Sequence, residues 1–247
     1  MGTVGSVLVL PYIFHQTHTQ LAKVSADIGI GIGLLLTLVA VQSTFLVAIC
    51  VWAGLWSSKK LGMGTPILST AINGGPWQTE LKAIAKPAIL VGLIIGVVVC
   101  LLDLAGSSLG APSLLADHPP IWMGFLASFY GAINEEIFLR LGVLTLIALL
   151  IRAIGRVAGG WREQLPATAF WLANATAAVL FGLGHLPGNI ALYGFSAVLL
   201  FQTLMLNGLV GITAGVLFRK YGLEAAMIMH FSCDLILHVV APALQVP

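Results

Sequence analysis

Long apolar stretches alternate with short polar connections along the whole chain. The stretches cover residues 27–57, 84–106, 120–151, 167–186, 190–218 and 223–245. Each is long enough for the roughly 20 apolar residues that a helix needs to cross a bilayer. Membrane barrels are instead built from strands of about ten residues with alternating polarity. The pattern therefore predicts an all-α fold, a polytopic transmembrane helix bundle of about six spans.

The N-terminal region is less regular than the rest. Residues 1–14 are apolar but too short for a full span, and they lack the basic start and small-residue cleavage site of a signal peptide. We expect an interfacial or partly embedded segment here, which adds a seventh or eighth membrane segment if it crosses. Residues 1–119 carry no motif, and we interpret them as membrane segments attached to a core at 120–245 within one embedded domain.

Composition supports a membrane protein and excludes several other classes. Hydrophobic residues make up 59% of the chain and charged residues only 8%, against about 25% charged in a soluble domain. We expect an integral protein of a bacterial plasma membrane. The net charge of +2 and the lack of a basic run argue against nucleic acid as a partner. Cys50, Cys100 and Cys233 are widely spaced, and we interpret them as small buried hydrophobic residues.

Basic residues gather in alternate connections. Segments 58–83, 152–166 and 219–222, with the adjoining Lys86, fall on one side of the predicted bundle. They hold nine of the eleven Lys and Arg residues, namely Lys59, Lys60, Lys82, Lys86, Arg152, Arg156, Arg162, Arg219 and Lys220. The positive-inside rule places this side in the cytosol. With six spans, both termini and the side nearer His185 then face outward.

A few ionisable residues lie inside the apolar stretches, where such groups are costly and mark a functional site by default. On a helix, residues i and i+4 share a face, so Glu136 can pair with Arg140. Glu135 points about 100° away from that pair. It remains a free carboxylate in an apolar setting, suited to accept a proton from water near neutral pH. His230 and Asp234 are also four residues apart.

The positions of Glu135, His230 and His185 along their predicted spans indicate whether they lie at the same depth in the membrane. Glu135 is 15 residues from the start of its stretch, and His230 is 15 residues from the end of its own on the same side. Their depths match. His185 lies at the predicted end of its span, just before Pro187, so it needs a tilt or a break in a helix. Gly131 is a candidate for such a break in the third span.

Three short motifs can be read in order on three predicted spans. They are Glu135-Glu136-Ile-Phe-Leu-Arg140, Phe181-Gly-Leu-Gly-His185 and His230-Phe-Ser-Cys-Asp234. This set resembles the signature of the CPBP intramembrane protease family, which includes CAAX prenyl endopeptidases and bacterial Abi-type proteins. The family pattern is EExxxR, FxxxH and HxxxN or HxxxD, and the resemblance covers roughly residues 120–245.

The resemblance implies a glutamic-type peptide hydrolase that acts on a peptide or a membrane-anchored protein. By position, Glu135 and His185 would activate a water, and His230 and Asp234 would stabilise the oxyanion. An Asn at the last position donates a hydrogen bond directly, whereas an ionised Asp cannot. Asp234 would therefore either be protonated or act by orienting His230.

The resemblance also implies supporting residues. Glu136 and Arg140 would hold their helix and its neighbours in place. Phe181, one turn before His185, would pack rather than react. It implies no metal or other cofactor.

Two other functions remain open from the residues alone. Two His and two carboxylates could bind zinc, which makes a zinc metallopeptidase the runner-up, although HExxH is absent. The third possibility is a non-catalytic immunity or scaffold protein of the membrane, or a transporter. A transporter is expected to show repeat symmetry or paired broken helices, and the sequence shows neither.

Overall fold

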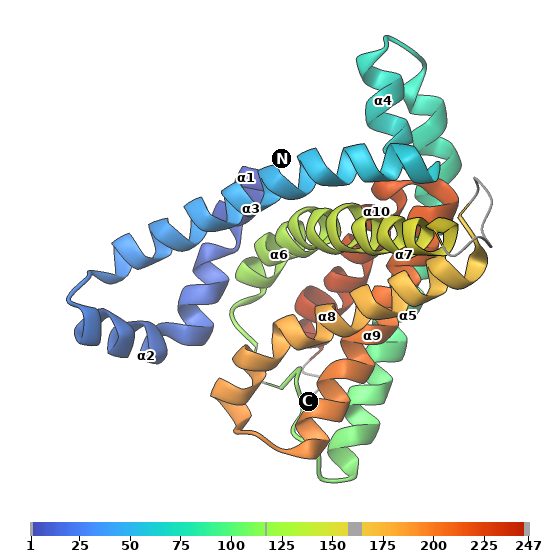
Figure 1. The fold of residues 1–247 in the computed structure, drawn as a ribbon. Coiled ribbons are helices and arrows are strands. Elements are labelled where there is room, and N and C mark those ends of the chain that lie inside the picture. The colour runs from blue at the N-terminus through green and yellow to red at the C-terminus, as the bar shows by residue number, and fades with distance from the viewer. Residues whose placement is uncertain (1, 117, 158–164, 245–247) are drawn as a thin grey trace.

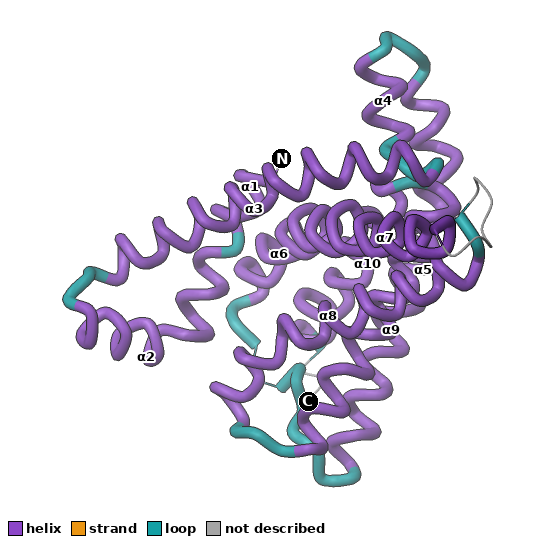
Figure 2. The backbone as a smooth tube through the Cα atoms, viewed as in Figure 1, coloured by secondary structure: helices purple, strands orange, loops and turns teal. Residues whose placement is uncertain are grey.

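The computed structural model describes residues 2–116, 118–157 and 165–244, and all regular structure in them is helical (Figures 1 and 2). The elements are α1 (Gly2–Leu8), α2 (Leu10–Ile28), α3 (Ile32–Leu61), α4 (Pro66–Ile72), α5 (Trp77–Ser108), α6 (Ile121–Tyr130), η1 (Gly131–Glu135), η2 (Ile137–Leu144), α7 (Thr145–Val157), α8 (Ala167–Tyr193), α9 (Ala197–Tyr221), α10 (Leu223–Leu235), η3 (Ile236–Val240) and α11 (Ala241–Ala243). The predicted all-α fold is confirmed.

Within the described residues, six helices are long and apolar enough to cross a membrane. They are α3, α5, the run Ile121–Val157, α8, α9 and the run Leu223–Ala243. Each corresponds to one predicted stretch, so the protein is a multi-pass integral membrane protein. The last predicted stretch ended at 245, and that residue lies outside the described part.

The C-terminal helices form the centre of the bundle. The start of α10 lies between α5 and α9, and α8 packs along α9. The helix that runs from α6 to α7 lies beside α3 (Figure 1). Small residues allow the closest of these approaches, because Gly92 of α5 faces the backbone oxygen of Met229. Cys233 is fully buried on the same helix as Met229, and all three cysteines are unpaired.

The polar connections are more helical than their composition predicts. Segment 58–83 was expected to be a loop. It holds α4 between the end of α3 and the start of α5, and α4 projects from the bundle together with the start of α5 (Figure 1). Pro66 stands in the first turn of α4, where its missing N–H costs nothing. Between α9 and α10 the turn is Gly222 alone, at φ +93°, a conformation that favours glycine. Arg162 of the basic connection 152–166 lies outside the described residues.

The first turns of the N-terminal segment are buried against the bundle. Gly2, Gly5 and Ser6 of α1 are buried, and α1 packs on α3, α6 and η1. Helix α2 then continues with non-helical angles at Thr17. Neither helix is among the six that meet the length and hydropathy needed for a span.

The predicted end of the fourth span at 186 was wrong. Helix α8 continues through Pro187 to Tyr193. Proline removes one backbone donor and usually ends a helix, but neighbouring helices in a membrane bundle tolerate that loss. His185 therefore lies two turns before the end of its helix, and no displacement of α8 is needed to bring it to the depth of the other site residues.

Candidate active site

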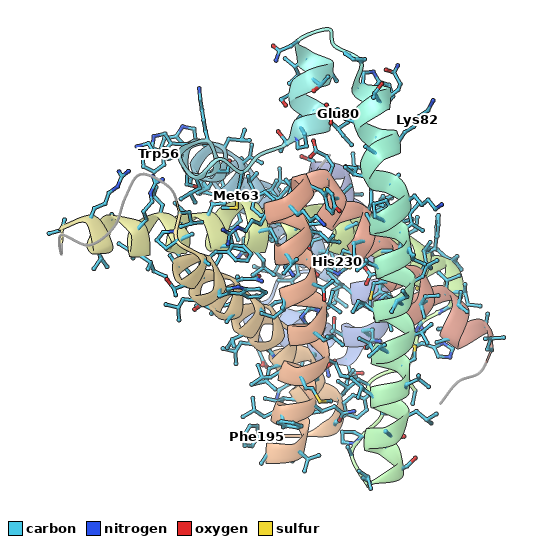
Figure 3. All side chains as sticks on the ribbon, turned by 90° about the vertical axis from the view of Figure 1, so that its right-hand side faces the viewer. Trp56, Met63, Glu80, Lys82, Phe195 and His230 are labelled. Carbon is cyan, nitrogen blue, oxygen red and sulfur yellow. The ribbon has the colours of Figure 1, made fainter. Side chains whose placement is uncertain are left out.

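The three motifs converge on one point inside the bundle. Glu135 ends η1, His185 lies on α8, and His230 lies on α10, at the middle of the molecule in Figure 3. Glu135 Oε1 is 4.0 Å from His185 Nε2, and Glu135 Oε2 is 3.8 Å from His230 Nε2. The imidazoles of His185 and His230 thus both face the carboxylate of Glu135, although the three residues are far apart in the sequence.

A change in helix type delivers Glu135 to this point. The α-helix ends at Tyr130, and a π-helical turn runs from Gly131 to Glu135. Such turns, with bonds from i to i+5, are rare and recur at functional sites. The predicted break at Gly131 therefore has the right position, but it is a change of hydrogen-bond pattern rather than a kink.

Glu136 is buried and contacts both Arg140 and His230. Its Oε2 lies 3.2 Å from Arg140 Nε, which confirms the predicted i, i+4 pair. Its Oε1 accepts a hydrogen bond from His230 Nδ1 at 2.7 Å. The geometry of the Arg140 contact is that of an ion pair and not of a hydrogen bond, since neither atom has a hydrogen-bond partner in the described residues. Arg140 also donates from Nη2 to the backbone oxygen of Gly211 at 3.0 Å.

Phe181 packs between the charged groups. Its ring lies 5.2 Å from Arg140 Cζ and stands edge-on to the rings of His185 and His230, at 4.8 and 5.7 Å. The aromatic ring thus shields the Glu136–Arg140 pair and limits the positions that both imidazoles can take. This position fits the packing role predicted for Phe181.

The two histidines present the same nitrogen to Glu135. His185 Nδ1 is 2.9 Å from the backbone oxygen of Phe181, which can only accept a hydrogen bond. His185 therefore carries a proton on Nδ1, and its Nε2 faces Glu135. His230 Nδ1 is held by Glu136, so its Nε2 also faces Glu135. Both rings are oriented by a partner on the far side, as functional histidines commonly are.

Exposure separates the two adjacent glutamates. The side chain of Glu136 is 0% exposed and that of Glu135 is 20% exposed. The His185 side chain is 39% exposed, against 4% for His230. Glu135 and His185 are therefore the groups that a molecule entering the site meets first.

Asp234 faces His230 across one helical turn. Its Oδ1 lies 3.6 Å from His230 Nε2, which is ion-pair distance and longer than an ordinary hydrogen bond. A Cβ at Gly131 would collide with Asp234 Oδ2 and lie 3.3 Å from His230 Nε2. The absence of a side chain at Gly131 thus makes room for both groups.

The site opens into a cavity of about 630 Å³. Its walls come from η1, α8, α9, α10 and η3, and on one side from α2, with Tyr12 and Gln16 among the lining residues. Burial raises the pKa of Tyr12 to about 12, with Asp234 as the next cause, so its phenol stays protonated. The Tyr12 ring stands edge-on to His238 at 5.6 Å. The motifs gave no sign of Tyr12 or His238, because neither lies in a recognisable pattern.

Asp103 is another buried carboxylate, and it was not identified from the sequence although it stands in an apolar stretch. Asp103 lies in the second predicted span and is fully buried on α5. It accepts hydrogen bonds from Ser113 Oγ at 2.7 Å, from the backbone N–H of Leu114 at 3.1 Å and from Gln202 Nε2 at 2.8 Å. Leu114 also lines the cavity. A lone Asp in an apolar stretch should have been singled out by the argument used for Glu135.

The residues were also compared with a metal site. In the described part of the chain, no group of three His, Cys, Asp or Glu side chains is arranged to hold a metal ion. The two histidines share Glu135 at 3.8 and 4.0 Å, and each has its other nitrogen engaged. Zinc ligands and acid–base histidines both have the second ring nitrogen engaged in this way.

The fold and the site together define a membrane protein with polar chemistry inside its bundle. A family model, described as type II CAAX prenyl endopeptidase Rce1-like, matches residues 117–236, the stretch that contains all three motifs. The stretch that holds the site is therefore similar to this family, and the resemblance predicted from the three motifs is confirmed for that stretch. No curated protein and no solved structure matches the chain.

Proposed function

We propose that the protein is a glutamate-dependent intramembrane endopeptidase, in which Glu135 and His185 activate the attacking water. The observation that carries the proposal is the different setting of the two adjacent glutamates. Glu136 is neutralised by Arg140 and bonded to His230, whereas Glu135 faces the cavity and has no cationic Arg or Lys beside it in the described residues. Glu135 is therefore the carboxylate available for acid–base catalysis.

The geometry supports a water between Glu135 and His185. The gap of 4.0 Å between Glu135 Oε1 and His185 Nε2 is too long for a direct hydrogen bond. One water can bridge such a gap. Because His185 carries its proton on Nδ1, its Nε2 is free to accept from that water together with Glu135. Hydrogen bonds from one water to Glu135 and His185 orient its lone pair toward a substrate carbonyl and prepare it to give up a proton.

The reaction then balances with the residues present. The water oxygen bonds to the carbonyl carbon, and its proton passes to Glu135. The tetrahedral intermediate collapses, the C–N bond breaks, and Glu135 returns the proton to the leaving amine. The products are a carboxylic acid and an amine.

His230 supports the charge that develops on the carbonyl oxygen. With Nδ1–H committed to Glu136, His230 donates from Nε2 only as an imidazolium. Three carboxylates, those of Glu135, Glu136 and Asp234, lie within 3.8 Å of its ring nitrogens and favour that charged form. Asp234 then acts through His230 and needs no proton of its own. A fixed donor aimed at a developing oxyanion is worth roughly 10²–10³ in rate.

The substrate class follows from the cavity and the family. The cavity is bounded largely by apolar side chains and is enclosed by membrane helices, so it suits a peptide carried on a membrane or lipid anchor. The matched family is described by its action on CAAX prenyl proteins. We propose a short peptide next to a lipid anchor or a membrane segment as substrate, with the bilayer as the route of delivery.

The test is cleavage of a membrane-embedded peptide library by purified protein. We expect Glu135→Gln to lower the rate by on the order of 10²–10⁴, the range for general acid–base catalysis, and His185→Ala to have a similar effect. Glu80→Gln is the matched control, since Glu80 is an exposed carboxylate in the first turn of α5. Full activity of both site variants would rule out the glutamate mechanism and favour a scaffold or immunity role.

A zinc metallopeptidase is the second candidate, because two imidazole Nε2 atoms face one carboxylate. The glutamate mechanism predicts unchanged cleavage after exhaustive treatment with a chelator. Loss of activity that added zinc restores would assign the chemistry to a metal instead.

A further inference from the structure

Two asparagines on different helices line the cavity and share one anchor. Asn207 Nδ2 donates to the backbone oxygen of Thr203 at 2.8 Å, and Asn189 Nδ2 bonds to the hydroxyl oxygen of Thr203 at 3.0 Å. Thr203 itself is fully buried on α9. Both asparagines belong to the wall of the cavity that contains Glu135, His185 and His230. None of the three motifs includes them.

The shared anchor fixes which way the amides point. A backbone oxygen only accepts, so the Asn207 group that contacts it is the NH₂ and not the oxygen. The Asn207 oxygen is therefore turned to the other side of the amide, and it is not among the buried atoms that lack a hydrogen-bond partner. In Asn189 the Nδ2 likewise donates, to the Thr203 hydroxyl oxygen. Each amide thus has one N–H bonded to Thr203 and its oxygen directed away from that bond.

A peptide in this cavity needs acceptors. Its backbone N–H groups leave water when it enters, and an unpaired buried amide costs free energy. Most of the lining is apolar and offers no oxygen. Glu135 and His185 are required for the water, and His230 donates rather than accepts. The two asparagine oxygens are neutral amide acceptors on the α8–α9 wall, which faces the reacting groups.

The position of Asn207 relative to the chemistry is known from its own helix. Gly211, one turn further along α9, receives the hydrogen bond from Arg140, the partner of Glu136. Asn207 is therefore about 6 Å along the helix axis from the level at which the glutamate network contacts α9. That is close to the rise of two residues of an extended peptide, about 6.6 Å.

We infer that Asn189 and Asn207 form a peptide-binding subsite that accepts backbone N–H groups of the substrate and sets its register against Glu135. The inference rests on the proposed endopeptidase function and names how that site holds a peptide. It also predicts that the recognised group is the peptide backbone, one or two residues from the scissile bond. The asparagines position the substrate and are not catalytic residues.

The competing explanation is that both amides are only structural, with Asn189 joining α8 to α9 and Asn207 bonding within α9. The chain offers a matched control for this. Asn174 Nδ2 on α8 donates to the backbone oxygen of Ile212 on α9 at 3.1 Å, and Asn174 is fully buried and not part of the cavity wall. Asn174→Ala removes an interhelical amide without touching the proposed subsite.

The experiment combines these variants with peptides methylated at single backbone nitrogens. The probe is a fluorescein-labelled peptide that ends in farnesyl-cysteine and three further residues, made with and without N-methyl at each bond. Its binding to the inactive Glu135→Gln protein in nanodiscs is measured by anisotropy, and its cleavage by active protein gives KM and kcat. Thermal unfolding of each variant reports on the helix contacts alone.

We expect Asn207→Ala and Asn189→Ala each to weaken binding and raise KM about fivefold, as for one lost hydrogen bond, with kcat changed less. One N-methyl position should cost wild type about fivefold and cost the Asn207→Ala protein nothing further. Asn174→Ala should leave binding unchanged. Equal N-methyl costs in all proteins, or an equal loss in Asn174→Ala, would overturn the inference.

Binding and cleavage separate the two proposals. Glu135-independent cleavage contradicts the mechanism but leaves the N-methyl pattern of binding to decide on the subsite. A Glu135-dependent cleavage with no N-methyl pattern contradicts the subsite alone. A probe that neither binds nor is cleaved counts against both.

Discussion

The first and the last spans of this protein are both apolar helices, but they have opposite surroundings. Only 6% of the most apolar window of Ile32–Leu61 is buried inside the protein, against 44% for Leu223–Ala243. The first has the higher mean hydropathy, 2.4 against 1.5. Of these two helices, the more apolar one has most of its surface outside the protein, and the less apolar one carries His230 and Asp234. In a membrane protein, the interior is where polar groups can be satisfied.

The largest effect that tests this comparison concerns the buried ion pair. Arg140→Leu leaves Glu136, at 0% exposure, without its guanidinium partner. Removing one partner of a buried pair costs about 3–5 kcal/mol. We expect a loss of that size in unfolding by SDS in mixed micelles. Arg140→Leu combined with Glu136→Gln should recover a large part of it, and an unchanged unfolding midpoint in the single variant would contradict the role of the pair.

The next effect concerns the buried carboxylate at the edge of the N-terminal part. Asp103→Leu removes the acceptor for Ser113, Leu114 and Gln202. Hydrogen bonds to a charged group contribute about 1.5–3 kcal/mol each, and the removal of a buried carboxylate offsets part of their sum, so a net loss of about 2–3 kcal/mol is expected. Proteolysis of the 109–120 connection should also become faster. Asp103→Asn, which keeps one acceptor oxygen, should lie between the two; equal stability of all three proteins would refute the assignment.

A smaller effect is expected where space and not charge is at stake. Gly131→Ala places a Cβ against Asp234 and His230. Asp234 has to move, so cleavage should fall about tenfold, equivalent to about 1.4 kcal/mol in the barrier. Gly184→Ala is the control, because a Cβ there meets nothing within 4 Å. The two variants are compared by kcat/KM. Equal values would show that Asp234 can move aside without loss of activity.

The smallest effect belongs to the lipid-facing helix. Trp52 on α3 is 78% exposed. Trp52→Leu keeps an apolar surface and should change stability by less than about 0.5 kcal/mol. The same SDS titration measures it. A loss comparable to that of Arg140→Leu would mean that α3 contributes to the core more than its burial indicates.

The number of spans, the Glu136–Arg140 pair and the position of the helix change at Gly131 could all be predicted from the sequence. They depend on local rules, namely hydropathy, the i, i+4 spacing and the freedom of glycine. The hydrogen bond from His230 to Glu136 could not be predicted, because it depends on how two distant helices rotate. The depth of His185 was misjudged because Pro187 was taken to end a helix that tertiary packing carries further.

Cavity residues that lie outside any motif could not be predicted from the sequence either. Tyr12 reaches the cavity because α1 packs against the bundle and α2 borders the site, which a short apolar start does not reveal. Asn189 and Asn207 lie in apolar stretches as single amides, and only the structure shows that they share Thr203. The membrane orientation predicted from the basic connections stays a prediction.

The π-helical turn at Gly131–Glu135 also determines which insertions and deletions the gene can tolerate. A π turn holds one residue more than an α turn between hydrogen-bonded partners. The five π-helical residues turn the chain through nearly the same angle as four α-helical residues. A deletion of one residue inside this turn is therefore absorbed by a return to the α pattern, and Arg140 keeps its direction toward α9. The same deletion in a purely α-helical span such as α9 rotates every residue beyond it by about 100°. Chain length in the third span can thus change by one codon at this turn without turning Arg140 away from its partner.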